Sequence, residues 1–204
     1  MKHKTGIVMA TMIEAAPFIS GLKLEEQTRR PFPLFSGNEF TLIISGIGKV
    51  YAALAAGILV REMGVKELHN AGAAGGLREG FHTGDILHVS EIIDFDRPKL
   101  VNKEIRRMKP DIIEGFRTAT LATLDRPVIH PEDRCLVGQY ADIIDMEGAG
   151  FLQACRTFGV KGYLWKMVSD TAEHEKDSEI IGNIRTLIAS LYDFMFRNVL
   201  RSSE

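Results

Sequence analysis

The sequence predicts an α/β protein in which helices cover both faces of a mostly parallel or mixed sheet. Short apolar runs alternate with segments of helical period along the chain, and glycine-rich turns follow several of the apolar runs. Such alternation is typical of sheets with helices packed on both sides. No repeat, low-complexity stretch or linker divides the 204 residues. We therefore expect a single domain over residues 1–204, which is long enough for a full core.

The first half of the chain is expected to hold four strands and two helices. The strands are short apolar runs, and the second helix is rich in Ala and Leu. The expected strands are residues 6–10, 40–45, 67–71 and 85–94, and the expected helices are residues 14–22 and 50–63. Residues 97–115, with two prolines and many charges, are the expected irregular surface segment.

The second half continues the alternation and ends in a long helix. Strands are expected at residues 119–123, 143–146 and 162–169, and helices at residues 131–140, 147–158 and 178–200. The last helix repeats apolar residues from Ile180 to Met195 at a spacing that gives one wide apolar face. We expect that face to pack on the sheet.

Composition excludes several classes of protein. A net charge of −2 favours neither nucleic acid nor an anionic membrane, and no run of 18 apolar residues is present. The six histidines show neither an i, i+4 pair nor an HExxH motif, so no metal site is expected. Cys135 and Cys155 lack metal spacing and are typical of reduced thiols, which favours a cytoplasmic protein.

Two glycine-rich segments follow apolar strands. Residues 45–50 (SGIGKV) could present backbone amides to an anion, or could simply form a tight strand-to-helix turn. Residues 70–77 (NAGAAGGL) narrowly miss the dinucleotide-binding fingerprint, because Asn70 replaces its first glycine and no helical period follows. We interpret residues 70–77 as a flexible backbone cradle against a sugar or a base.

Three carboxylates, Glu14, Glu147 and Asp170, stand just after apolar runs, at the positions where open α/β sheets bind ligands. Glu147 either interacts with a helix dipole or accepts hydrogen bonds from ribose hydroxyls. Met146 beside it offers a flexible apolar contact for a ring. Asp170, after Ser169, is either a turn residue or a general acid whose apolar surroundings raise its pKa.

Taken in order, these motifs resemble the nucleoside phosphorylase/nucleosidase superfamily, and most of all its 5′-methylthioadenosine/S-adenosylhomocysteine nucleosidases. The resemblance runs through residues 6–14, 45–50, 71–77, 84–86, 145–147 and 169–170. It implies a three-layer α/β/α fold around a mixed, barrel-like central sheet, and hydrolysis of the N-ribosidic bond of a purine nucleoside. It also implies no metal, no organic cofactor, no nucleic-acid or membrane partner, and a homodimer.

The resemblance also assigns roles to residues. Glu14 matches the acid that activates the attacking water, and Glu147 matches the acid that holds the ribose hydroxyls, with Met146 beside the sugar. Asp170 matches the acid that protonates the purine, and Ser169 helps to position it. Gly72 and Ala73 belong to the cradle, and Val128 to the loop that must form one wall of the purine pocket.

Two departures leave the substrate open. Ala73 replaces a serine of the family, and the chain is short between Asp94 and Ile143, where relatives build part of the purine pocket. The expected substrate is a 5′-substituted adenosine, with futalosine or an adenosyl-lipid as alternatives.

The expected reaction is hydrolysis, with phosphorolysis as the alternative, because the phosphorylases' arginine and serine are absent around residues 70–73. A catalytically decayed purine-binding module is the non-enzyme alternative. The small-residue stretch from Ala52 to Gly57 permits a close helix approach, either to the sheet or to a second subunit, and the second possibility supports the expected homodimer.

Overall fold

A ring of five strands forms the centre of the computed structural model, which describes residues 4–97, 104–174 and 176–200. Within this ring β5 pairs with β10, β10 with β6, β6 with β8, β8 with β9, and β9 again with β5. The pairings are both parallel and antiparallel. The five strands are β5 (Glu67–Gly76), β6 (Ile86–Asp94), β8 (Thr118–Thr123), β9 (Ile143–Asp145) and β10 (Lys161–Asp170). The predicted mixed, barrel-like sheet is confirmed.

The remaining strands extend the sheet from the ring. From β5 it continues through β1, β4, β3 and β2, while β7 pairs with β6. These strands are β1 (Thr5–Met9), β2 (Glu25–Thr28), β3 (Leu34–Ser36), β4 (Phe40–Ile44) and β7 (Arg106–Met108).

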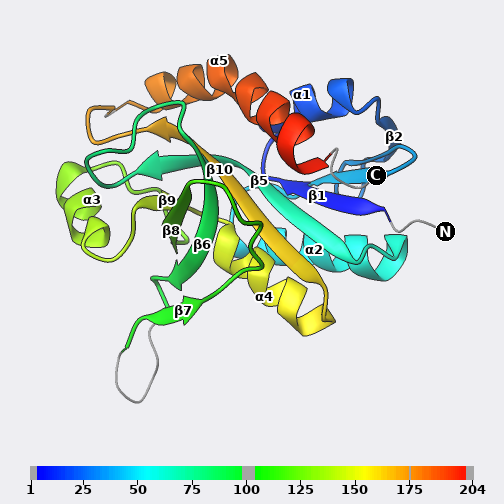
Figure 1. Cartoon of the computed structure of the whole chain (residues 1–204), viewed down its shortest axis with the longest axis horizontal. Helices are drawn as coiled ribbons and strands as arrows, with labels where there is room; N and C mark the ends of the chain where they lie inside the picture. The colour runs from blue at the N-terminus through cyan, green and yellow to red at the C-terminus, as the bar shows by residue number, and fades with distance from the viewer. Residues whose placement is uncertain (1–3, 98–103, 175, 201–204) are drawn as a thin grey trace.

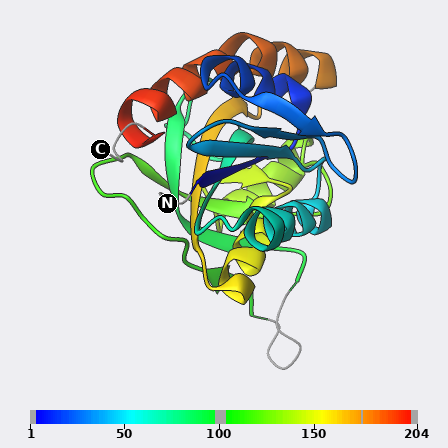
Figure 2. The same ribbon diagram turned by 90° about the vertical axis from the view of Figure 1, so that its right-hand side faces the viewer.

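Helices cover the sheet on both sides, as Figures 1 and 2 show. The helices α1 (Met12–Gly21) and α5 (Asp177–Met195) lie together on one side. On the other side lie α2 (Lys49–Met63) and α4 (Gly148–Phe158), while α3 (Pro131–Gly138) sits at one end. A π-helical turn, Phe196–Leu200, follows α5. This arrangement confirms the predicted three layers.

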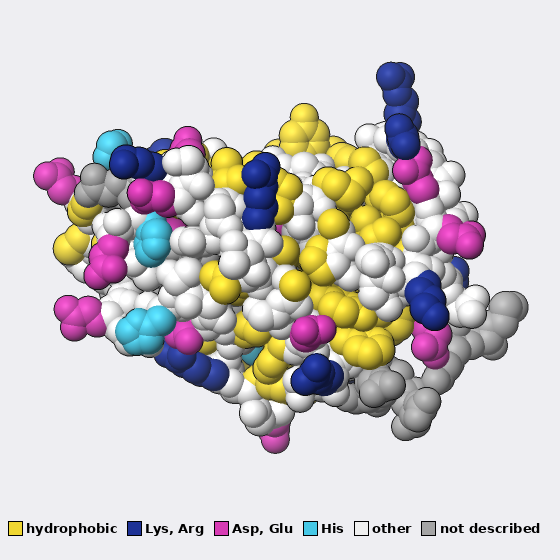
Figure 3. Space-filling view, turned by 90° about the horizontal axis from the view of Figure 1, so that it is seen from above, with side chains coloured by type: hydrophobic (Ala, Val, Ile, Leu, Met, Phe, Trp, Pro, Cys, Tyr) yellow, Lys and Arg dark blue, Asp and Glu magenta, His cyan; other side chains and the backbone are white. Residues whose placement is uncertain are grey.

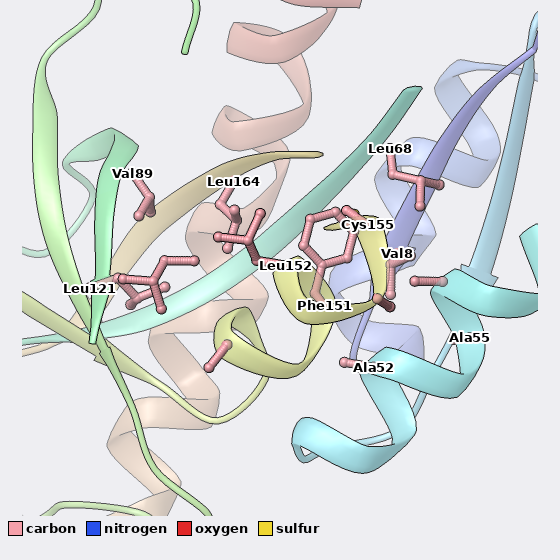
Figure 4. Close-up of a cluster of buried hydrophobic side chains, with 14 of the residues drawn as sticks. Val8, Ala52, Ala55, Leu68, Val89, Leu121, Phe151, Leu152, Cys155 and Leu164 are labelled. Carbon is pink, nitrogen blue, oxygen red and sulfur yellow. The ribbon is translucent and has the colours of Figure 1, made fainter. Parts of the chain in front are cut away.

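Each helical layer packs on its own apolar cluster. The cluster under α2 and α4 includes Ala52, Leu121 and Phe151, which Figure 4 shows between the helices and the strands. The cluster under α1 and α5 includes Phe18 and Trp165. Hydrophobic side chains also gather on the outer face seen from above, with charged side chains mostly toward its edges (Figure 3). No described helix is long and apolar enough to cross a membrane.

Five elements differ from the sequence-based expectation. The predicted cradle at residues 70–77 is regular strand as far as Gly76, because β5 keeps its pairing with β10 through the glycines. The strands β2 and β3 were not expected, since all four residues of β2 are exposed and polar. β7 lies inside the segment predicted to be irregular, of which residues 98–103 are outside the described residues. The last helix is regular only to Met195.

The small residues of α2 do not form a surface. Ala52, Ala55 and Ala56 are fully buried, and Figure 4 shows Ala52 and Ala55 pointing toward the core. They let α2 approach α4 so closely that a Cβ on Gly150 would lie 2.1 Å from the carbonyl oxygen of Lys49. These three residues therefore pack within the chain and cannot contact a second subunit, whereas Leu54 of the same stretch is 54% exposed.

Candidate active site

A pocket of about 320 Å³ opens where β1, β5, β9 and β10 end. It gathers residues from all three layers of the fold. Buried carboxylates come from α1, β9, the start of α4 and the end of β10, and apolar side chains come from α5. Its walls include Thr11, Glu14, Ile47, Ala73, Val128, Arg134, Asp145, Met146, Glu147, Ser169, Asp170, Ile180 and Ile184. The three carboxylates singled out in the sequence therefore share one cavity.

Glu14 is fixed at the start of α1 by three hydrogen bonds. The backbone N–H and the hydroxyl of Thr11 donate to its Oε2 at 3.0 and 2.7 Å, and the N–H of Ala73 donates to its Oε1 at 2.9 Å. The bonds with Thr11 form a capping box, so Glu14 also stabilises the helix. The N–H donors still leave lone pairs on the carboxylate, which can accept further hydrogen bonds.

Glu147 is buried at the N-cap of α4, where its side chain makes no capping bond. The N–H of Gly48 donates to its Oε1 at 2.9 Å, and the N–H of Met146 to its Oε2 at 3.3 Å. Burial, and after it the charge of Asp145, raise the pKa of Glu147 to about 7, although Lys166 and the Gly48 N–H act in the opposite direction. The glycine turn at residues 45–50 thus presents an amide to a carboxylate of the same chain.

A buried ion pair lies next to Glu147. Lys166 Nζ is 2.8 Å from Asp145 Oδ2, and both side chains are almost fully buried. Thr123 and the N–H of Gly148 also donate to Asp145, at 2.7 and 2.8 Å. Burial alone lowers the pKa of Lys166, but Asp145 and Glu147 outweigh burial and raise it. Lys166 therefore supplies a buried positive charge next to the carboxylates of Asp145 and Glu147.

Asp170 ends β10, but its surroundings are not the apolar ones that the sequence suggested. Arg134 from α3 forms a buried ion pair with Asp170 Oδ2. The hydroxyl of Ser169 donates to Oδ1 at 2.5 Å. The expectation of apolar surroundings for Asp170 is therefore wrong, because a cation from a distant helix faces it.

The other predicted site residues fall around these carboxylates. Ala73, Met146, Ser169 and Val128 line the pocket. Gly72 is not among the lining residues; it lies behind Glu14, and a Cβ on it would be 2.6 Å from Oε1.

The loop that carries Val128 is tethered to α2. Lys49 Nζ lies 3.1 Å from Asp125 and 3.0 Å from Asp94. Arg126, Pro127 and Val128 of this loop line the pocket.

Sequence reasoning missed several residues of the site. Arg134 sits in a polar helix and gives no sign of burial, whereas Lys166 stands inside the apolar run from Tyr163 to Val168, a signal that could have marked it as a buried cation. The apolar residues Ile180 and Ile184 of α5 also line the pocket, although the sequence predicted only packing for that face. Among the described residues, no group of three or more His, Cys, Asp or Glu side chains could hold a metal ion.

Comparison with known proteins gives the family. The Phosphorylase superfamily profile matches residues 4–105 of the chain. This chain belongs to the Phosphorylase superfamily. One similar protein is a 5′-methylthioadenosine/S-adenosylhomocysteine nucleosidase of Shewanella denitrificans. It is 28% identical to this chain over 212 residues, and the alignment covers 87% of this chain and 92% of the relative.

Solved structures with a similar fold superpose on nearly the whole of this chain. The apo structure of Arabidopsis thaliana 5′-methylthioadenosine nucleosidase has a TM-score of 0.88 at 20% identity, covering 99% of this chain and 97% of its own. Futalosine hydrolase of Helicobacter pylori has a TM-score of 0.84 at 21% identity, covering 98% and 99%. The predicted superfamily and fold are confirmed, and the relatives' names support an enzyme of the nucleosidase type.

Proposed function

We propose that this chain hydrolyses the N-ribosidic bond of a purine nucleoside, with a 5′-substituted adenosine as its substrate class. The observation that carries the proposal is the meeting of Glu14, Glu147 and Asp170 in one pocket of about 320 Å³. That volume is at the lower end of small-ligand sites. The names of the similar proteins, nucleosidases for methylthioadenosine and S-adenosylhomocysteine, support the same reaction.

The carboxylates divide the chemistry among them. Glu14 accepts a proton from water as the water oxygen attacks the anomeric carbon. Glu147, with a pKa of about 7, can accept from one ribose hydroxyl and, when protonated, donate to another. Asp170 faces the base, which takes up a proton as the C1′–N9 bond breaks. Met146 and Val128 supply the apolar walls for the sugar and the base.

Hydrolysis is favoured over phosphorolysis by the charge of the pocket. Four buried carboxylates, Glu14, Asp145, Glu147 and Asp170, line it. Two buried cations, Arg134 in the wall and Lys166 next to Asp145 but outside the lining, are already engaged in ion pairs. A phosphate dianion beside Glu14 would meet a like charge at short range. Water carries no such penalty, so it is the nucleophile that this pocket accepts most readily.

One assay tests the reaction and its alternatives. The protein is incubated with adenosine, 5′-methylthioadenosine, inosine and futalosine, each with and without phosphate, and the free base and the sugar product are measured. We expect free base and free sugar, at a rate independent of phosphate. A sugar 1-phosphate would assign phosphorolysis instead, and binding of nucleosides without release of base would assign a purine-binding module.

We further propose a homodimer that forms through the exposed face of α2 and the turn before it. Ile47, Val50, Tyr51 and Leu54 are each more than half exposed, although all are large and apolar. Exposed apolar groups of this kind mark interaction sites. Ile47 also lines the pocket, so a second copy on this face would cover the pocket mouth.

A cytoplasmic location is proposed on the cysteines alone. Cys155 is buried, Cys135 is exposed, and neither forms a disulfide. Unpaired thiols are typical of a reducing compartment.

A further inference from the structure

Arg134 is a buried cation that the proposed reaction does not yet use. Its side chain is only 3% exposed, and it meets Asp170 at the wall of the pocket. Its Nη1 donates to the carbonyl of Gly76 at 3.0 Å, while its Nε has no hydrogen-bond partner among the described residues. Arginine is almost never fully buried unless it is paired. This arginine is both paired and incompletely satisfied.

The absence of a side chain at Gly75 leaves room for the Arg134–Asp170 ion pair. A Cβ on Gly75 would lie 3.1 Å from Asp170 Oδ2 and 3.3 Å from Arg134 Nη1, so a larger residue would crowd both groups. The pairing of β10 with β5 also shifts register between Val168 and Asp170. Such bulges are common beside active sites, where they redirect a side chain. Three elements, α3, β5 and β10, thus converge on one ion pair.

Stability alone does not account for this arrangement. Desolvating two charges can cost as much as their attraction returns, and apolar side chains of similar volume often serve a fold equally well. The unpartnered Nε adds a further cost. A pair of this kind at a pocket wall is therefore better explained by what it does for a bound molecule.

We propose that Arg134 is a positioning residue for the departing base, acting through Asp170; this inference rests on the proposed function. As the C1′–N9 bond breaks, its electron pair moves to the purine, the water oxygen bonds to C1′, and one water proton goes to Glu14. The purine takes up one proton from solvent, and Glu14 later releases its proton to solvent, so no proton is gained or lost overall. Negative charge therefore grows on the base beside Asp170 before that proton is fully transferred.

Arg134 makes this end of the pocket electrically neutral. Asp170 with Arg134 carries no net charge, whereas Asp170 alone would add a third carboxylate to Asp145 and Glu147, which have only Lys166 to balance them. A negatively charged wall would oppose a base that leaves with an electron pair. The guanidinium also fixes Oδ2, so that the carboxylate meets the base in one orientation.

The test compares Arg134→Gln with a matched control, Arg78→Gln. Arg78 holds the same helix from outside the pocket, where its Nε donates to Gly138 O at 2.6 Å and its Nη1 lies 3.1 Å from Asp142. Each variant is assayed with two substrates. The first is the nucleoside that the wild type cleaves fastest among adenosine, 5′-methylthioadenosine and inosine. The second is the same nucleoside with 6-chloropurine as its base, which is a better leaving group. We expect Arg134→Gln to lower kcat on the natural base by about 100-fold, the usual effect of losing one preorganised electrostatic group. KM should change much less, and the loss should be clearly smaller with the 6-chloropurine substrate.

Two further variants separate positioning from folding. Arg134→Lys keeps the charge and should recover part of kcat, and Arg134→Ala should be partly rescued by millimolar ethylguanidinium. Equal losses with both leaving groups, or equal losses in the Arg134 and Arg78 variants, would leave Arg134 with a structural role only and overturn the inference. Full activity of Arg134→Gln would overturn it while leaving the proposed function intact. A wild-type protein that releases no base would defeat both.

Discussion

Replacing Glu147 with Gln should stabilise the protein at alkaline pH and weaken it as an enzyme. Glu147 is buried, and burial raises its pKa to about 7. Above that pH the folded chain holds a buried charge next to Asp145, which Lys166 balances only in part. Gln keeps the shape of the side chain and removes that charge. Stability gained together with function lost is the usual behaviour of active-site residues.

The size and the sign of the effect follow from the pKa. A rise from 4.5 to about 7 corresponds to a cost on the order of 3 kcal/mol at high pH. Below about pH 4.5 Glu147 is protonated in both the folded and the unfolded state, so the cost is absent. It develops as pH rises between these two values, because there the folded state binds more protons than the unfolded state. It is complete above about pH 7.

Comparing two pH values isolates the charge from the hydrogen bonds. Gln can accept from only one of the two N–H donors, Gly48 and Met146, and the unpaired donor costs about 1–3 kcal/mol at either pH. That loss cancels when the stability change at pH 5 is subtracted from the change at pH 8. The difference should favour Gln at pH 8 by about 2–3 kcal/mol.

Urea unfolding of wild type and variant at pH 5 and pH 8 measures this difference. Glu62→Gln, on the exposed side of α2, is the control and should change stability equally at both pH values. The same Glu147 variant should raise KM for ribonucleosides about 10- to 100-fold, the worth of a hydrogen bond to a charged group, and much less for 2′-deoxy analogues. A stability change that does not depend on pH would refute the electrostatic reasoning, and an unchanged ribose-to-deoxyribose preference would refute the sugar contact.

Three further predictions concern other elements. Glu14→Gln should lower kcat by at least about 100-fold while leaving adenine binding intact. Thr11→Ala removes both the helix cap and the hydroxyl that donates to Glu14 Oε2, and it should cost roughly 0.5–2 kcal/mol of stability. It should lower kcat much less than Glu14→Gln does, because the N–H groups of Thr11 and Ala73 still hold the carboxylate. Leu54→Glu on α2 should convert a dimer of 22.7 kDa chains into monomers in light scattering, and a wild-type protein that is already monomeric would contradict the dimer. Burial lowers the pKa of His88, so below about pH 6.5 the unfolded state binds more protons; stability should fall with decreasing pH more steeply in wild type than in His88→Gln, as urea midpoints would show.

The sequence predicted the layers and the carboxylates for the same physical reason. Apolar runs bury themselves as strands, and the polar residue that ends such a run is left at the edge of the sheet. Glu14, Glu147 and Asp170 each stand at such an end, and the structure brings all three to one pocket. Each pattern needed only local information, which is why the alternation along the chain indicated a sheet between helices, whereas the barrel-like closure of the sheet was expected only from the resemblance to the superfamily.

Features that depend on distant residues were not predictable in this way. The strand β2 is wholly exposed, so no apolar alternation marks it, and it exists because it pairs with β3. β5 continues through its glycines because β10 supplies hydrogen bonds, against the low strand preference of glycine. Arg134 is buried because α3 folds back over the end of β10, 36 residues from Asp170 in sequence.

The buried carboxylates of the pocket divide by the kind of group that holds them. Asp145 and Asp170 each meet a buried cation, Lys166 and Arg134, so each pair is neutral as a unit. Among the described contacts, Glu14 and Glu147 are held by N–H and hydroxyl donors instead.

Neutral donors fix a carboxylate in place without balancing its charge. Taking a proton from water and binding sugar hydroxyls both need a carboxylate with free lone pairs, which suits Glu14 and Glu147. Facing a base that departs with an electron pair needs a wall without net charge, which suits Asp170 with Arg134. In the proposed reaction the four carboxylates thus act differently at the two ends of one pocket, because the chain supplies cations to only two of them.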